Sequence, residues 1–181
     1  MPEATNFQSE LDDDDELQDV TDHPSEVEAV SPVEALSPVV IDILTAATEV
    51  AGRRGHALVT ADDLFAALIS SDCAATRTLE SIGMQGDRLL EQLAFILGRN
   101  NHVEKSSVTG RSPRVEQILG SARMDAGRRG VQAVDSLHLL SAILRARNGV
   151  PSLLLETPGL GLEPVGAALN RALREGTTDP S

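Results

Sequence analysis

A repeat at a constant offset of 75 positions constrains this chain more than any other feature. Ser-Pro-Val-Val-Ile-Asp-Ile-Leu begins at Ser37, and Ser-Pro-Arg-Val-Glu-Gln-Ile-Leu begins at Ser112. The run Ala-Gly-Arg-Arg-Gly occupies 51–55 and returns at 126–130. The same offset relates identical apolar residues, namely Val40/Val115, Ile43/Ile118, Leu44/Leu119, Ala47/Ala122, Val59/Val134 and Leu64/Leu139. Such a repeat indicates one supersecondary unit used twice, with the apolar faces of the two copies buried together.

The first two helices of each copy have clear start signals. Ser37 and Ser112 are favourable N-caps, and the proline after each suits the first helical turn. Apolar residues at helical spacing then make one face of each first helix. The second helix of copy one is expected from about Thr60, which forms with Asp63 a pattern that resembles a capping box. Its counterpart in copy two is expected to start at Asp135.

Two further helices complete each copy. In copy one they are expected to follow Asp72 and Asp87, which are plausible N-caps. In copy two, one helix should contain Pro151 in its first turn and the last should begin near Pro164. The register shifts by one residue here, which indicates an insertion near 148–151. The prediction is an all-α fold, a pseudo-twofold double four-helix repeat of eight short helices.

Composition supports helices and sets the domain limits. The chain has 181 residues but only three aromatic ones, so its core must be built from Leu, Ile, Val and Ala, which favours close-packed helices. We expect a disordered acidic tail (1–36), a double-repeat domain (37–175: repeat one 37–98, linker 99–111, repeat two 112–175) and a disordered C-terminus (176–181).

The net charge of −13 is concentrated in the tail. Residues 1–36 hold 12 of the 28 acidic side chains and no Lys or Arg, so the remainder has a balance of −1. A near-neutral folded part argues against nucleic-acid binding, which requires a basic surface. The run 12–16 repels itself, and the tail is interpreted either as solubilising or as a docking arm for a basic partner.

Targeting signals and membrane segments are not recognised. The N-terminus has no basic stretch followed by an apolar run, and no apolar run is long enough to span a bilayer. A single cysteine, Cys73, excludes an intrachain disulfide and is compatible with a reducing compartment. A cytoplasmic location and no membrane contact are expected.

Catalytic chemistry finds little support. Cys73 with His56 would be the only thiol and base to consider, and Cys73 is more consistent with a buried helix-start residue. The histidines lack metal-ligand spacing, and His138 should hydrogen-bond locally after its cap. No Gly-x-x-x-x-Gly-Lys-[Ser/Thr] loop occurs, and Lys105 is the only lysine. We predict a non-enzymatic protein with no cofactor and no metal.

The remaining candidates are binding residues at the ends of helices. Asp62 and Asp63 share a first helical turn, where they complement the helix dipole or bind a cationic peptide. Matching basic pairs end the first helix of each copy, where they are solvated ends or contacts for an acidic partner or the acidic tail. The full candidate set is Thr60, Asp62, Asp63, Arg53, Arg54, Arg128 and Arg129.

The order of these motifs resembles the Clp N-terminal repeat domain (Clp R domain) of ClpA- and ClpC-type ATPases. The resemblance lies in Ala-Gly-Arg-Arg-Gly-His, a short Val-containing connector, a capped helix with Leu-Phe-Ala-Ala-Leu, and a helix that stops at Ile-Gly before Leu-Leu. It covers about 36–175. The family usually has Gly-Thr-Glu-His-Leu-Leu at the second helix, and in some members that Glu receives the guanidinium of phosphoarginine. By position Asp62 takes its place in copy one, and Leu137, which cannot pair with a cation, takes it in copy two.

The resemblance implies a protein-binding module acting as adaptor, regulator or decoy in Clp-type ATP-dependent proteolysis. Its implied partners are Clp ATPase or protease subunits, their adaptors or their substrates. The alternative is a free-standing chaperone that holds unfolded segments in apolar grooves between helices without a Clp partner.

Overall fold

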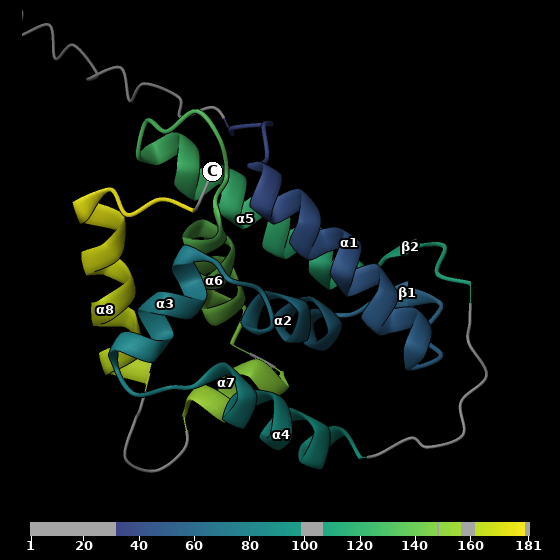
Figure 1. Cartoon of the computed structure of the whole chain (residues 1–181). Coiled ribbons are helices and arrows are strands. Elements are labelled where there is room, and N and C mark those ends of the chain that lie inside the picture. Colours follow the sequence, from purple (N-terminus) through teal and green to yellow (C-terminus); the bar gives the residue numbers. More distant parts are fainter. Residues whose placement is uncertain (1–31, 99–106, 148, 157–161, 180–181) are drawn as a thin grey trace, which may run out of the picture.

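The computed structural model describes residues 32–98, 107–147, 149–156 and 162–179. In this part of the chain the predicted all-α repeat is confirmed, with eight helices and two very short strands (Figure 1). The elements are α1 (Pro38–Arg53), β1 (Leu58–Val59), α2 (Ala61–Ile69), α3 (Ala74–Ser81), α4 (Gly86–Leu97), β2 (Gly110–Arg111), α5 (Pro113–Arg128), α6 (Ser136–Arg145), α7 (Val150–Leu155) and α8 (Leu162–Glu175).

The predicted N-caps of the first two helices in each repeat are confirmed. The Ser37 side chain accepts a hydrogen bond from the amide of Val40, and Ser112 is the matching cap of α5. Thr60 and Asp63 form a complete capping box at α2, and Asp135 caps α6. These side chains satisfy amides that the first helical turn leaves without partners, so the sequence repeat is translated directly into matched helix starts.

Three other helix starts differ from the prediction. The N-cap of α3 is Cys73 rather than Asp72, whose exposed side chain instead lies 3.7 Å from Arg77. Helix α4 begins at Gly86, one residue before Asp87, and α8 begins at Leu162, ahead of Pro164. The two aspartates and the proline signal a helix start correctly, but tertiary contacts set the first residue.

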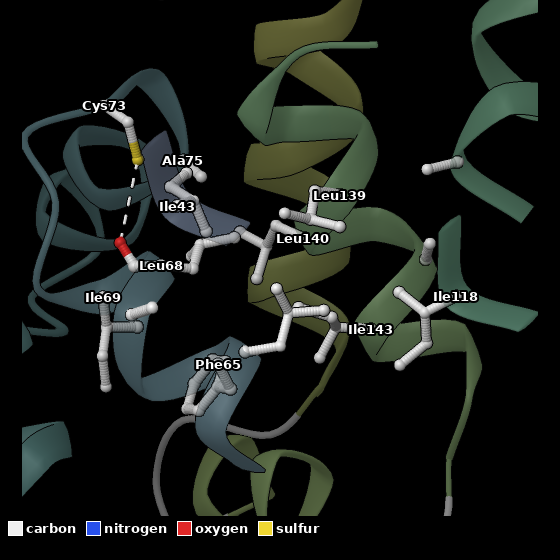
Figure 2. Close-up of a cluster of buried hydrophobic side chains, with 14 of the residues drawn as sticks. Ile43, Phe65, Leu68, Ile69, Cys73, Ala75, Ile118, Leu139, Leu140 and Ile143 are labelled. Carbon is white, nitrogen blue, oxygen red and sulfur yellow. Dashed lines mark hydrogen bonds between the residues drawn. The ribbon is translucent and has the colours of Figure 1, made fainter. Parts of the chain in front are cut away.

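Helix α2 lies at the centre of the molecule (Figure 1). All of its residues are buried except Asp62, and it contacts α1, α4, α6 and α7. Figure 2 shows Phe65 and Leu68 of α2 in the same cluster as Leu140 and Ile143 of α6. The two repeats therefore bury their second helices against each other, as the duplicated apolar pattern predicts.

Extended segments also join the two repeats, because a segment of each repeat pairs through its backbone with the other repeat. Strand β2, just before α5, pairs in parallel with β1 of repeat one. At the pseudo-equivalent place Leu36, just before α1, forms a parallel bridge with Val134 of repeat two. The amides of Ser37 and Ser112 both donate across these joints, each at 2.9 Å. Residues 32–36, which we had assigned to the tail, thus belong to the folded part, whereas 1–31 lie outside the described residues.

Candidate functional site

The turn between α1 and α2 is built around the buried carboxylate of Asp63. Its Oδ1 accepts from Arg54 Nη1 at 3.2 Å, and its Oδ2 lies 2.8 Å from His56 Nδ1. The same Oδ2 accepts from the backbone N of Thr60 at 3.0 Å and from the Thr60 hydroxyl at 2.7 Å. Gly55, at φ 74°, reverses the chain after α1 and brings Arg54 and His56 to the start of α2. Asp63 has no exposed surface, so an external cation would reach it only if this turn opened.

Asp62 points in a different direction and is partly buried. Burial is the main cause that raises the pKa of its carboxyl above the ordinary value of 3.8, and the charge of Asp63 adds to this increase. Three basic side chains, including Arg114 of repeat two, act in the opposite direction. Asp62 Oδ1 lies 3.9 Å from the position that a Cβ on Gly149 would occupy, so it faces the N-terminus of α7. Leu137 stands at the matching place in repeat two and is fully buried.

The two matching arginine pairs differ in exposure. The first arginine of each pair, Arg53 or Arg128, is exposed at the end of its helix. The second contacts a buried acid: Arg54 belongs to the cluster at the α1–α2 turn, and Arg129 Nε lies 3.3 Å from Asp125 Oδ2. Arg54 is half-buried by its contact, whereas Arg129 stays exposed beside Arg128.

The candidate thiol and base are not brought together. Cys73 is buried, with Sγ 3.1 Å from Thr76 Oγ1, whereas His56 is held by the α1–α2 turn. His56 precedes α2 and Cys73 follows it, and the nine residues of this helix make it about 13 Å long. His138 bonds locally to Asp135 Oδ1 at 2.7 Å, as predicted. Among the described residues no group of His, Cys, Asp or Glu could hold a metal ion; His23 and His102 lie outside them.

Two open surface hollows could accept a protein segment. The first, of about 640 Å³, lies between α1 and the region of β2. Its lining mixes apolar and polar side chains, among them Ile41, Leu44 and Thr48 of α1. The second lies on α4 beside Phe95, whose surface is 88% exposed. Neither hollow has a separate signal in the sequence, because the exposed Phe95 belongs to an otherwise amphipathic helix.

A further acidic residue, Asp179, was missed because we had placed 176–181 outside the folded part. Its carboxylate reaches the N-termini of three helices. Nothing in its local sequence could have indicated this, because the partners lie far away along the chain.

The fold and these surfaces define the chain as an all-α double-repeat domain with open surface hollows. The family model for the Clp repeat (R) N-terminal domain matches residues 35–156. The chain therefore belongs to the Clp N-terminal domain family, and the predicted resemblance is confirmed. No helix among the described residues has the length and apolar character needed to cross a bilayer.

The chain spans about one seventh of the length of the curated relatives that it matches. It is 23% identical over 121 residues to the negative regulator of genetic competence ClpC/MecB of Bacillus subtilis, covering 66% of this chain and 15% of that protein. It is 29% identical over 125 residues to the chloroplastic chaperone protein ClpC2 of Oryza sativa, covering 68% and 13%.

Solved structures of isolated N-terminal domains share the fold. The Arabidopsis thaliana ClpD domain superposes with a TM-score of 0.63 at 17% identity, covering 81% of this chain and 99% of that one. The Hsp104 N-terminal domain of Candida albicans gives 0.62 at 17% identity, covering 80% and 95%.

Proposed function

We propose that this chain is a non-enzymatic protein-binding module that acts as an adaptor, regulator or decoy in a Clp-type ATP-dependent proteolysis system. The observation that carries the proposal is a Clp N-terminal double repeat with open surface hollows. Its partners would be Clp ATPase or protease subunits, their adaptors or their substrates, in the cytoplasm. The mechanism is competition or delivery, since a domain of this fold can occupy the segments that an ATPase N-domain binds.

Charge suggests how the candidate residues would contribute. Arg53, Arg128 and Arg129 are exposed and would meet an acidic partner segment. Asp62 is the accessible carboxylate of the set, but basic side chains already surround it. That environment favours binding of a neutral or weakly cationic segment over binding of phosphoarginine. Asp63, Thr60 and Arg54 would support the surface from within, because their contacts hold the ends of helices.

The proposal is tested by measuring binding of the full chain separately to a ClpC-type ATPase, a ClpP-type protease and an arginine-phosphorylated protein. Binding to the ATPase or the protease would support a regulatory or adaptor role. Binding only to the marked protein, lost in Asp62→Ala but kept in the exposed control Asp42→Ala, would identify a substrate receptor or decoy. Binding to none of the three would refute the proposal.

The exposed apolar side chains of α4 favour one alternative, a chaperone that holds unfolded segments without a Clp partner. Phe95 is 88% and Ile96 47% exposed, and two adjoining exposed apolar side chains can contribute to a surface that binds an apolar segment. The discriminating assay is suppression of aggregation of an unrelated protein in the absence of any ATPase. Suppression that weakens in Phe95→Ser would support the alternative, and no suppression would exclude it.

A further inference from the structure

The carboxylate of Asp179 is held by donors from three different helices. Its Oδ1 accepts from the backbone N of Ala74 at 3.0 Å and from the hydroxyl of Ser136. Its Oδ2 accepts from the backbone N of Ser136 at 2.9 Å and from the Ser37 hydroxyl at 3.5 Å. These residues belong to the first turns or caps of α3, α6 and α1, so three helix N-termini converge on one anionic group.

The donors of this site are held in place by contacts that do not involve Asp179. The N-cap of α3, Cys73, supplies no side-chain hydrogen bond that caps the helix, which leaves the amide of Ala74 in need of an acceptor. Ser136 is fully buried and its hydroxyl also accepts from the amide of Ala75 at 3.1 Å, so its orientation is fixed. The partial positive charges of helix N-termini favour an anion here. The bound group is therefore a carboxylate in a pre-organised set of donors.

The pseudo-twofold shows why an acid from a distant segment occupies this end. At the equivalent end of the molecule Asp62, on α2, faces the N-terminus of α7, whose cap Gly149 supplies no side-chain hydrogen bond. The residue matching Asp62 in repeat two is the buried Leu137, which can offer no acceptor to α3. Asp179 supplies the missing carboxylate from beyond α8.

The segment that carries Asp179 can leave without disturbing a helix. Helix α8 ends at Glu175, and Gly176 at φ 67° turns the chain away from it. Thr177 and Thr178 are exposed and lie outside any helix or strand. Release of the carboxylate therefore breaks its own hydrogen bonds and little else, the condition for an exchangeable contact.

We propose that Asp179 is an intramolecular ligand that occupies a carboxylate-binding site at the junction of α1, α3 and α6, and that an acidic segment of a partner protein binds there by displacing it. This inference rests on the proposed protein-binding function. The tethered carboxylate lowers the apparent affinity for an external one in proportion to the fraction of molecules whose site is open. If that fraction is about one tenth, removing the Asp179 charge strengthens external binding about tenfold.

The test is a titration of the ¹⁵N-labelled full chain with acetyl-Gly-Asp-Gly-amide, a peptide with a single carboxylate, followed by NMR. In Asp179→Asn the amides of Ala74 and Ser136 should shift with an apparent Kd about tenfold lower than in the wild type. Glu175→Gln, which removes an exposed acid at the end of α8, should titrate like the wild type. Equal affinities in wild type and Asp179→Asn, or shifts that do not include these two amides, would overturn the proposal.

A second measurement needs no variant and holds even if Asp179→Asn weakens the fold. Saturating peptide should lower the heteronuclear NOE of Asp179 and Thr178 in the wild type, because the segment leaves its site. An unchanged NOE at saturation would equally overturn the inference. The peptide titration contains none of the three proteins used to test the proposed function. Displacement by the peptide without binding to any of those three would keep this inference and refute the proposed function, and the reverse result would do the opposite.

Discussion

Replacing Asp63 by Ala tests whether the α1–α2 turn depends on a buried charge. The substitution removes the acceptor for Arg54, His56 and Thr60 at once and deletes half of the capping box. Loss of one partner from a buried ion pair costs about 3–5 kcal/mol, and loss of a cap about 1 kcal/mol. The Arg54 side chain is 27% exposed and can regain water, which places the total near the lower limit. We expect the free energy of unfolding to fall by about 3 kcal/mol.

Urea unfolding followed by circular dichroism measures this loss. A fall of about 3 kcal/mol corresponds to a Tm lower by about 6–12 °C for a domain of this size. Asp42→Ala, on the exposed face of α1, should stay within about 0.5 kcal/mol of the wild type. In the double variant Arg54→Met with Asp63→Ala the losses should be less than additive, because the two side chains share one interaction. A loss below about 1 kcal/mol in Asp63→Ala would refute the reasoning.

Three further predictions follow from local environments. Because burial raises the pKa of Asp62, the stabilising contribution of its carboxyl is complete below pH 3.8 and is lost as the pH rises through the folded-state pKa. Asp62→Asn cannot ionise and should therefore become more stable than the wild type as the pH increases, by up to about 1 kcal/mol in urea unfolding at pH 7. A difference independent of pH would contradict this. Gly86→Ala would place a Cβ 2.6 Å from the carbonyl oxygen of Ile69 and should lower the free energy of unfolding by about 1–3 kcal/mol. Gly166→Ala, in the interior of α8 with open space around it, should raise the free energy of unfolding by about 0.5–1 kcal/mol. Equal Tm values for the two variants would be inconsistent with the packing. Cys73 is fully buried, so its reaction with a disulfide reagent should be at least about 100-fold slower in the native than in the urea-unfolded protein, and fast native labelling would show that it is accessible.

The repeated helix starts could be predicted because they depend on local chemistry. Ser37, Ser112 and Thr60 each satisfy amides within three or four residues, so their roles are visible in a short stretch of sequence. The buried faces of α1 and α5 likewise follow from helical spacing of apolar residues. What the sequence could not provide is the partner of each polar side chain once the helices pack together.

The candidate binding residues illustrate that limit. Asp62 and Asp63 are adjacent and chemically identical, yet one is partly exposed and the other is enclosed by Arg54, His56 and Thr60. The difference arises from the 100° step between neighbours on a helix, combined with the return of the chain after α1. The pair Asp125 and Arg129 differs, because its i,i+4 spacing is a local pattern, although Val50 replaces the acid in repeat one. No such spacing indicates that Arg54 and His56 close over Asp63.

Backbone pairing between the two repeats explains why two similar units form one domain. The segment before α1 pairs with the turn before α6, and the segment before α5 pairs with the turn before α2. Neither repeat therefore completes its own backbone hydrogen bonds alone. Separated repeats would expose these amides and the apolar face of α2 or α6, both of which are costly in water. The repeats diverge at their polar ends: Asp179 accepts hydrogen bonds from the N-termini of α3 and α6, whereas Asp62 only faces the N-terminus of α7. The shared apolar pattern therefore fixes a symmetric core, while the acidic side chains at its two ends differ.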